Sequence, residues 1–163
     1  LGVCQEVTYE GQAAVELEHL ARRGRALPLD FGVTASVLDP APLIAGLVAG
    51  LRAHHDIADL AAGFHAAVIR ATADAVHHSA GALGIATVGL TGGVFVNRLL
   101  LDGLRKELTD NGFEVLTHAV LPCNDGGLAL GQAVIAASLV GTSPPAKDSE
   151  RGRDTCASEF PAN

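Results

Sequence analysis

Thr91-Gly92-Gly93-Val94-Phe95-Val96-Asn97 is the stretch on which the fold of this chain depends. It follows a short β-type run, residues 86–90, and precedes apolar residues at helical spacing, Leu100, Leu101, Leu104 and Leu108. Glycines let the backbone come close to an anion, and the free N–H groups of a helix start point toward it. Strand, glycine turn and helix therefore predict an α/β fold with a possible phosphate site at Gly92 and Gly93.

A second glycine turn, Asn124-Asp125-Gly126-Gly127, again precedes a helical pattern, residues 126–140. Two such turns in one small domain suggest a single ligand held from two sides. A glycine pair can also serve the conformation of its own turn and nothing else, and the spacing alone leaves that interpretation open.

Asp125 is a carboxylate on a glycine-flanked turn with no basic neighbour in the sequence. If the side chain is buried, it needs a positive partner, which a metal ion or the N–H groups of the turn would supply. The alternative is that Asp125 caps the last helix. The residues alone leave both interpretations open.

Composition excludes several classes of protein. Of the 163 residues, 48% are hydrophobic and 18% are charged, which is typical of one globular domain. The net charge of −7 and the absence of a basic run argue against a nucleic-acid partner. The longest apolar stretch, residues 128–140, is too short to span a membrane. Three widely spaced cysteines without a CxxC pair favour a reducing, cytoplasmic location.

The chain contains no methionine, so we expect it to be a piece of a longer polypeptide. Residues 1–140 read as one domain. Residues 141–163 are polar, carry prolines and lack periodicity, which predicts a disordered tail.

The remaining pattern predicts alternating helices and short strands. The expected helices are 10–23, 43–51, 56–78 and 97–110, and the β-like runs are 32–38, 86–90 and 113–118. None of the seven histidines has HxxxH or HExxH spacing, and His65 is expected to be a satisfied structural histidine. No residue is assigned as catalytic.

Four motifs in order resemble the C-terminal part of the HypF carbamoyltransferases, which act in the maturation of NiFe hydrogenase. They are Tyr9-Glu10-Gly11-Gln12-Ala13-Ala14, Gly63-Phe64-His65, the stretch from Thr91 to Leu101, and Pro122-Cys123-Asn124-Asp125-Gly126-Gly127 with the following residues to Gln132. The resemblance implies an α/β fold that is half of an actin-like (ASKHA) ATPase domain, with a small sheet covered by helices. Residues 1–140 would be the C-terminal lobe of that domain.

The resemblance also implies a site. In such proteins the double glycine lies at the nucleotide phosphates and the asparagine contacts the nucleotide, which here implies Gly92, Gly93 and Asn97. The turn Glu10-Gly11-Gln12 would face the nucleotide. Asp125 would be a ligand of a divalent metal, Fe or Zn, whose other ligands belong to a histidine-rich motif of the preceding lobe that this sequence does not contain.

The implied chemistry begins with carbamoyl phosphate and ATP, which give carbamoyl adenylate at a separate domain. This lobe would hold the adenylate while the carbamoyl group passes to a cysteine of a HypE-like acceptor protein, for synthesis of a cyanide ligand. With the preceding lobe missing, the fragment alone is predicted to be inactive. The alternatives are a related O-carbamoyltransferase or tRNA threonylcarbamoyl transferase, or a non-catalytic nucleotide-binding remnant.

Overall fold

The computed structural model describes residues 1–34 and 37–141, so the predicted tail lies outside the described residues except for Gly141. The chain divides into two compact units, Leu1–Leu128 and Ala129–Asn163, and each is described here by itself. The predicted domain boundary at residue 140 stays a prediction.

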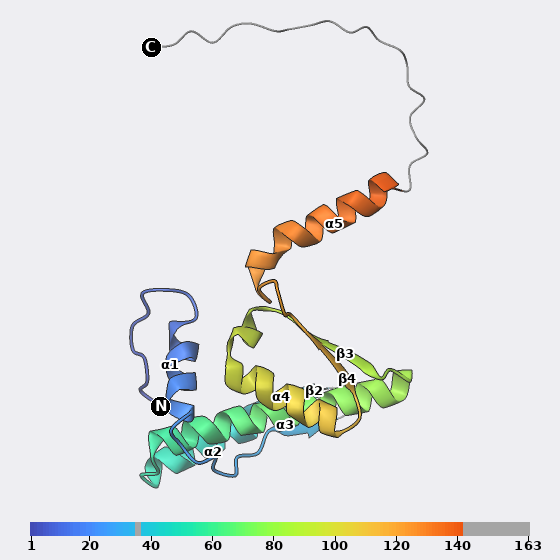
Figure 1. The fold of residues 1–163 in the computed structure, drawn as a ribbon. Coiled ribbons are helices and arrows are strands. Elements are labelled where there is room, and N and C mark those ends of the chain that lie inside the picture. Colours follow the sequence, from blue (N-terminus) through green and yellow to red (C-terminus); the bar gives the residue numbers. More distant parts are fainter. Residues whose placement is uncertain (35–36, 142–163) are drawn as a thin grey trace, which may run out of the picture. The chain divides into compact units, whose positions relative to one another are not determined.

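The first unit is built around one long helix, α3 (Ile57–Leu83). Its start is fixed by Asp56, whose carboxylate accepts a hydrogen bond of 2.7 Å from the N–H of Ala58. Gly84 ends it in the left-handed conformation, with φ of 66°. Three further helices pack against α3: α1 (Gln12–Ala21), α2 (Ala41–Arg52) and α4 (Arg98–Asp110) (Figure 1).

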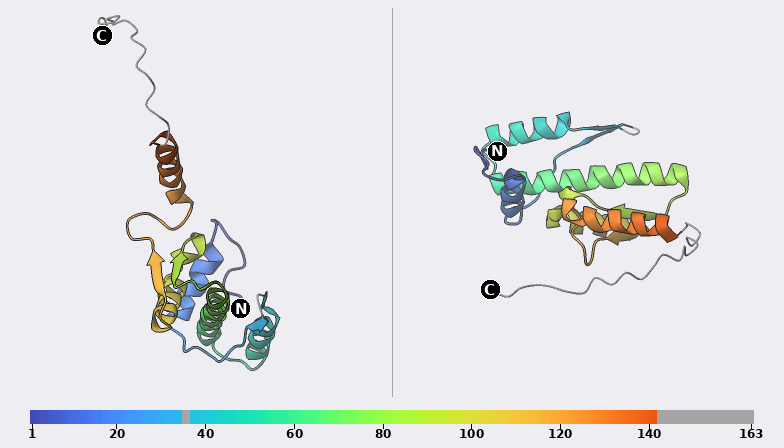
Figure 2. Two further views of the ribbon diagram at one scale, coloured as in Figure 1. Left: turned by 90° about the vertical axis from the view of Figure 1, so that its right-hand side faces the viewer. Right: turned by 90° about the horizontal axis from the view of Figure 1, so that it is seen from above.

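The residues that α3 buries are mostly small, because neighbours approach it from several directions. Figure 2, left, shows α3 nearly end-on between α4 and α2. Ala61, Ala67, Ala71 and Ala73 are buried. At Gly63, a Cβ atom would lie 2.7 Å from the carbonyl oxygen of Leu27, so this helix surface leaves no room for a larger residue.

The predicted strand, turn and helix are present. Strand β3 (Thr87–Leu90) pairs in parallel with β4 (Glu114–Thr117), and α4 makes the connection between them. Leu101, Leu104 and Leu108 of α4 form a buried cluster with Leu90 and Ala73. Four residues that the sequence placed in the turn form a separate 3-10 helix, η1 (Gly93–Val96), between β3 and α4.

One element differs from its prediction. The expected single run 32–38 is two strands, β1 (Gly32–Thr34) and β2 (Val37–Asp39), paired antiparallel. The two residues between them are Ala35 and Ser36, neither of which is a glycine, proline or asparagine that would signal a reversal. The pair leads into α2, and Asp39 accepts a hydrogen bond of 2.9 Å from the N–H of Ala41 at the start of that helix.

The second glycine turn forms another 3-10 helix, η2 (Asp125–Gly127), and α5 (Leu128–Gly141) follows it. Apolar residues lie on all sides of α5, so its sequence does not distinguish an apolar face from a polar one. In the described part of the chain, no helix is long and apolar enough to cross a membrane.

Candidate functional site

The first glycine turn presents open backbone at the end of β3. Gly92 has φ of 103°, in the left-handed region that favours glycine. A Cβ atom built at Gly93 would meet no atom within 4 Å, so the space over this residue is free. A ligand can therefore approach the main chain of Gly93 directly.

Two hydrogen bonds tie this turn to the segment that leads into the second turn. The N–H of Gly92 donates to the carbonyl oxygen of Cys123 over 2.8 Å. The hydroxyl of Thr91 lies 2.8 Å from Nε2 of His118. The structure thus brings the first turn against the residues that directly precede Asn124 and Asp125.

The N-terminus of α4, from which free N–H groups were expected, already has protein acceptors. Oδ1 of Asn97 accepts from the N–H of Leu100 over 3.1 Å. A carboxylate oxygen of Glu18, on α1, accepts from the N–H of Arg98 over 3.0 Å and pairs with Arg22 at 2.6 Å. Two of the three N–H groups that open α4 are thus engaged, and η1, not α4, directly follows the glycines.

The N–H groups without a protein acceptor at the turn lie at the start of η1. The first hydrogen bond of η1 runs from the N–H of Phe95 to Gly92, so the N–H groups of Gly93 and Val94 precede it. Among the described residues, no acceptor is recorded for these two groups. They are the groups that can meet an anion here.

Asn97 joins η1 to α4, and its side chain is held from two sides. Its amide nitrogen lies 3.0 Å from Nε2 of His65, which is 4% exposed and whose Nδ1 lies 2.8 Å from the carbonyl oxygen of Ala61. His65 is thus buried and hydrogen-bonded through both ring nitrogens, as predicted for a satisfied histidine. Its link to Asn97, 32 residues away, has no signal in the sequence.

The turn Glu10-Gly11-Gln12 lies at the start of α1, where Gly11 is the N-cap residue with φ of 82°. The side chain of Gln12 accepts from the N–H of Thr8 over 2.8 Å and donates to Glu16 over 2.8 Å. Among the described residues, no hydrogen bond or ion pair links this turn to Gly92, Gly93 or Asn97. A role for it at the nucleotide stays a prediction.

Asp125 is the first residue of η2 and is exposed, so the argument from a buried carboxylate does not apply. The cap of η2 is made by Asn124, whose side chain accepts from the N–H of Gly126 over 3.1 Å. Asp125 is therefore not the cap of η2, and its role as a cap of the last helix stays a prediction. In the part of the chain that the structure describes, no three His, Cys, Asp or Glu residues gather to hold a metal, so these residues do not form a complete metal site by themselves.

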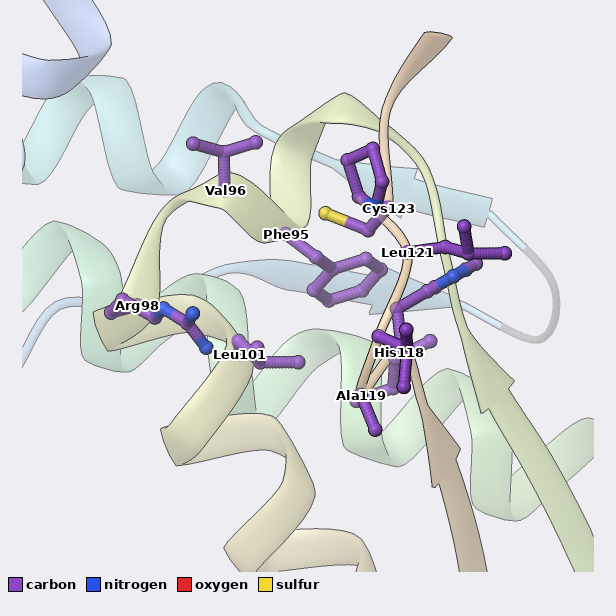
Figure 3. Close-up of a pocket in the computed structure, with 11 residues that line it drawn as sticks. Phe95, Val96, Arg98, Leu101, His118, Ala119, Leu121 and Cys123 are labelled. Atoms are coloured by element: carbon purple, nitrogen blue, oxygen red, sulfur yellow. The ribbon is translucent and has the colours of Figure 1, made fainter. Parts of the chain in front are cut away.

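A cavity of about 320 Å³ lies beside the first turn. Phe95 and Val96 of η1 line it together with Arg98 of α4, and His118 and Cys123 close it from the segment after β4. Figure 3 shows the Phe95 ring in the middle of this lining, with Arg98 on one side and His118 on the other. Arg98, which carries a positive charge and lines this cavity, has no signal in the sequence that would single it out.

Neither cysteine that the structure describes is marked as a nucleophile. Burial raises the pKa of the Cys4 thiol, the carboxylate of Glu16 raises it further, and a raised pKa leaves less reactive thiolate. The carbonyl of Cys123, not its thiol, is the group bonded to the turn.

Comparison with known proteins identifies close relatives of this sequence. A family model described as carbamoyltransferase, Kae1-like domain, second subdomain, matches residues 1–132. The carbamoyltransferase HypF of Rhizobium leguminosarum bv. viciae is 39% identical over 133 residues, which cover 81% of this chain and 17% of that protein. HypF of Rhodobacter capsulatus is 40% identical over 139 residues, covering 85% and 18%. The chain thus spans less than a fifth of the length of these relatives.

Solved structures agree. A full-length HypF in its phosphate- and nucleotide-bound form superposes with a TM-score of 0.74 at 36% identity, covering 87% of this chain and 19% of that one. HypF of T. kodakarensis gives a TM-score of 0.76 at 26% identity, covering 86% and 18%. The predicted α/β fold, half of an actin-like domain, is confirmed.

Proposed function

This chain belongs to the HypF carbamoyltransferase family, and we propose that it is the nucleotide-holding C-terminal lobe of a longer, cytoplasmic carbamoyltransferase. In the whole protein, carbamoyl phosphate and ATP give carbamoyl adenylate. This lobe holds the adenylate while its carbamoyl group passes to a cysteine of a HypE-like acceptor, which supplies the cyanide ligand during NiFe hydrogenase maturation.

The observation that carries the proposal is the open turn at Gly92 and Gly93. Its free N–H groups at Gly93 and Val94 are the donors that a phosphate needs, and nothing covers Gly93. A related HypF is known in a phosphate- and nucleotide-bound form, and its structure superposes on most of this chain.

The role of the turn in the reaction follows from where charge develops. The acceptor thiolate attacks the carbamoyl carbon, a C–S bond forms, and the bond from that carbon to the phosphate oxygen breaks. AMP leaves with the electron pair, so negative charge grows on its phosphate. The N–H groups of Gly93 and Val94 stabilise that charge because they are already in place, and the guanidinium of Arg98 adds to the positive potential.

Asp125 is the one residue that this chain would contribute to the divalent metal, Fe or Zn. An exposed carboxylate without a hydrogen bond or ion pair among the described residues fits one ligand position, and the remaining ligands would come from the preceding lobe. Such a metal supplies a Lewis acid. With one ligand of its own, the fragment is inactive alone.

The similarity to named HypF proteins favours this activity over that of an O-carbamoyltransferase or a tRNA threonylcarbamoyl transferase. A non-catalytic, nucleotide-binding remnant is the second candidate.

The test uses the full-length protein that contains these residues, as wild type and as Asp125→Ala. Carbamoyl phosphate, ATP and a cysteine-bearing acceptor protein are supplied, and carbamoyl adenylate and acceptor thiocarbamate are followed separately. We expect the variant to form the adenylate and to fail to load the acceptor. Asp110→Ala, an exposed carboxylate at the end of α4, is the matched control and should load normally. Normal loading by Asp125→Ala would refute its role in transfer.

A further inference from the structure

His65 of α3 is buried, and both of its ring nitrogens are engaged. Nδ1 lies 2.8 Å from the carbonyl oxygen of Ala61, one turn earlier in the same helix. Nε2 lies 3.0 Å from the amide nitrogen of Asn97. The ring of Phe64 packs edge-on against the imidazole at 5.5 Å between centroids.

The partners of these atoms allow a single arrangement of protons. The carbonyl of Ala61 can only accept, so Nδ1 must carry a hydrogen. The N–H of Leu100 can only donate, so the atom of Asn97 that faces it is Oδ1, which turns the NH₂ group toward His65. Nε2 therefore accepts, and the imidazole is neutral with its proton on Nδ1.

This arrangement orients the amide of Asn97 and leaves part of its hydrogen-bonding capacity unused. An asparagine amide has two hydrogens to donate and two lone pairs to accept with. His65 takes one hydrogen and Leu100 takes one lone pair, so one of each remains for a ligand. Without His65, Oδ1 could still cap α4, but the amide plane would be free to turn about that single bond.

We propose that His65 is a positioning residue for the nucleotide: by accepting from Asn97, it fixes the amide so that the second hydrogen meets the bound nucleotide. The inference rests on the proposed function, because it takes Asn97 as a nucleotide contact. It explains why a polar ring fills a buried site on α3 that an apolar side chain of similar size would fill without a cost of desolvation.

The test measures nucleotide binding at this lobe in the full-length protein. Hydrogen exchange of the peptide containing residues 91–97 is followed as a non-hydrolysable ATP analogue is added, and the concentration for half-maximal protection is compared among variants. His65→Phe keeps the ring and removes the acceptor. His65→Gln keeps an acceptor oxygen near the place of Nε2.

We expect His65→Phe to raise the half-maximal concentration by roughly tenfold, the effect of one well-placed hydrogen bond, and His65→Gln to stay within about threefold of wild type. Asn97→Ser keeps an oxygen for the cap and removes the amide. Its half-maximal concentration should rise as much as that of His65→Phe. The double variant should be no weaker than Asn97→Ser alone, because His65 acts through Asn97.

Each failure has its own signature. Protection absent from wild type would overturn the proposed function. If Asn97→Ser binds the ATP analogue more weakly and His65→Phe binds it as tightly as wild type, only the role of His65 is overturned. An unchanged Asn97→Ser would remove Asn97 from the nucleotide site, and the role of His65 with it. If His65→Phe does not fold, His65→Asn takes its place, because its shorter amide can still bond to Ala61 but does not reach Asn97.

Discussion

At the scale of single residues, Gly92 and Gly93 are glycines for different reasons. Gly92 has φ of 103°, which an L-amino acid rarely adopts, so its lack of a side chain serves the backbone. Gly93 has no such angle, and a Cβ atom there would meet nothing within 4 Å. Neither the backbone angle nor a close neighbour requires a glycine at position 93, and the space over it is open to a ligand.

This difference predicts unequal costs for the two alanine substitutions. Gly92→Ala should lower the free energy of unfolding by about 1–2 kcal/mol, because alanine must be held in a strained conformation. Gly93→Ala should stay within about 0.5 kcal/mol of wild type. Urea unfolding of the two variants measures both values. Equal losses would show that the turn needs two glycines for its shape and that Gly93 is not reserved for a ligand.

Glu18 gives a second prediction at this scale. Its carboxylate accepts from the N–H of Arg98 at the start of α4, where a negative charge also meets the helix dipole. Glu18→Ala should therefore lower the free energy of unfolding by about 1 kcal/mol. Arg22→Ala removes only the ion pair within α1, which is half exposed on the arginine side, and should cost about 0.3 kcal/mol. Thermal unfolding of both variants separates the two contacts, and equal losses would show that the contact to Arg98 contributes nothing.

The residues of the turn could be named from the sequence because glycines between a strand and a helix are a local signal. The contacts that hold the turn could not be predicted in the same way. Glu18 and Arg98 are 80 residues apart and His65 and Asn97 are 32 apart, and hydrophobic periodicity contains no information about which polar groups meet across helices. The same limit applies to the cap of η2, where Asn124 and Asp125 were equally suitable by residue type.

At the scale of elements, α3 is the part of the fold on which the others pack, and close approach is what its neighbours require. The backbone of Gly24, just after α1, passes so near to α3 that a Cβ atom there would lie 2.0 Å from the carbonyl oxygen of Ala58. Backbone cannot move aside as a flexible side chain can. The contact of α1 with α3 therefore depends on a glycine that the sequence marked only as a helix end.

We expect Gly24→Ala to lower the free energy of unfolding by about 3 kcal/mol, because α1 must move away from α3. Gly81 is the matched control, since it lies within α3 and a Cβ atom there meets nothing within 4 Å. Gly81→Ala should raise stability by about 0.5–1 kcal/mol through helix propensity. Denaturant unfolding gives both values, and a Gly24→Ala variant as stable as wild type would contradict the packing described here.

Helices were easier to predict than strands for a physical reason. The four helices of the first unit have caps or apolar repeats that can be read locally, and Asp56 and Asn97 are found at two of the predicted starts. The β1–β2 pair and η1 are only three or four residues long, too short for periodicity to reveal a reversal or a change of helix type.

At the scale of the whole molecule, we propose that this chain carries one side of a site. The structures it resembles are about five times longer, with coverage of 19% and 18% of their chains. The turn, Asn97 and Asp125 could be predicted because the family motifs contain them. Under the proposed function, the remaining contacts of the nucleotide and the metal would lie in residues outside this sequence, and neither the sequence nor the fold of this lobe supplies them.

We propose above all that a nucleotide phosphate binds at the backbone of Gly93 and Val94. The most direct measurement is hydrogen exchange of the full-length protein with and without a saturating non-hydrolysable ATP analogue, read on peptides that cover residues 91–97. We predict slower exchange there in wild type and no change in Gly93→Val, whose side chain would occupy the open space, where a Cβ atom meets nothing within 4 Å. Gly89→Val, also open at its Cβ, should respond as wild type does. Unchanged exchange at 91–97 in wild type would contradict the account, because the turn would then serve the conformation of the chain alone.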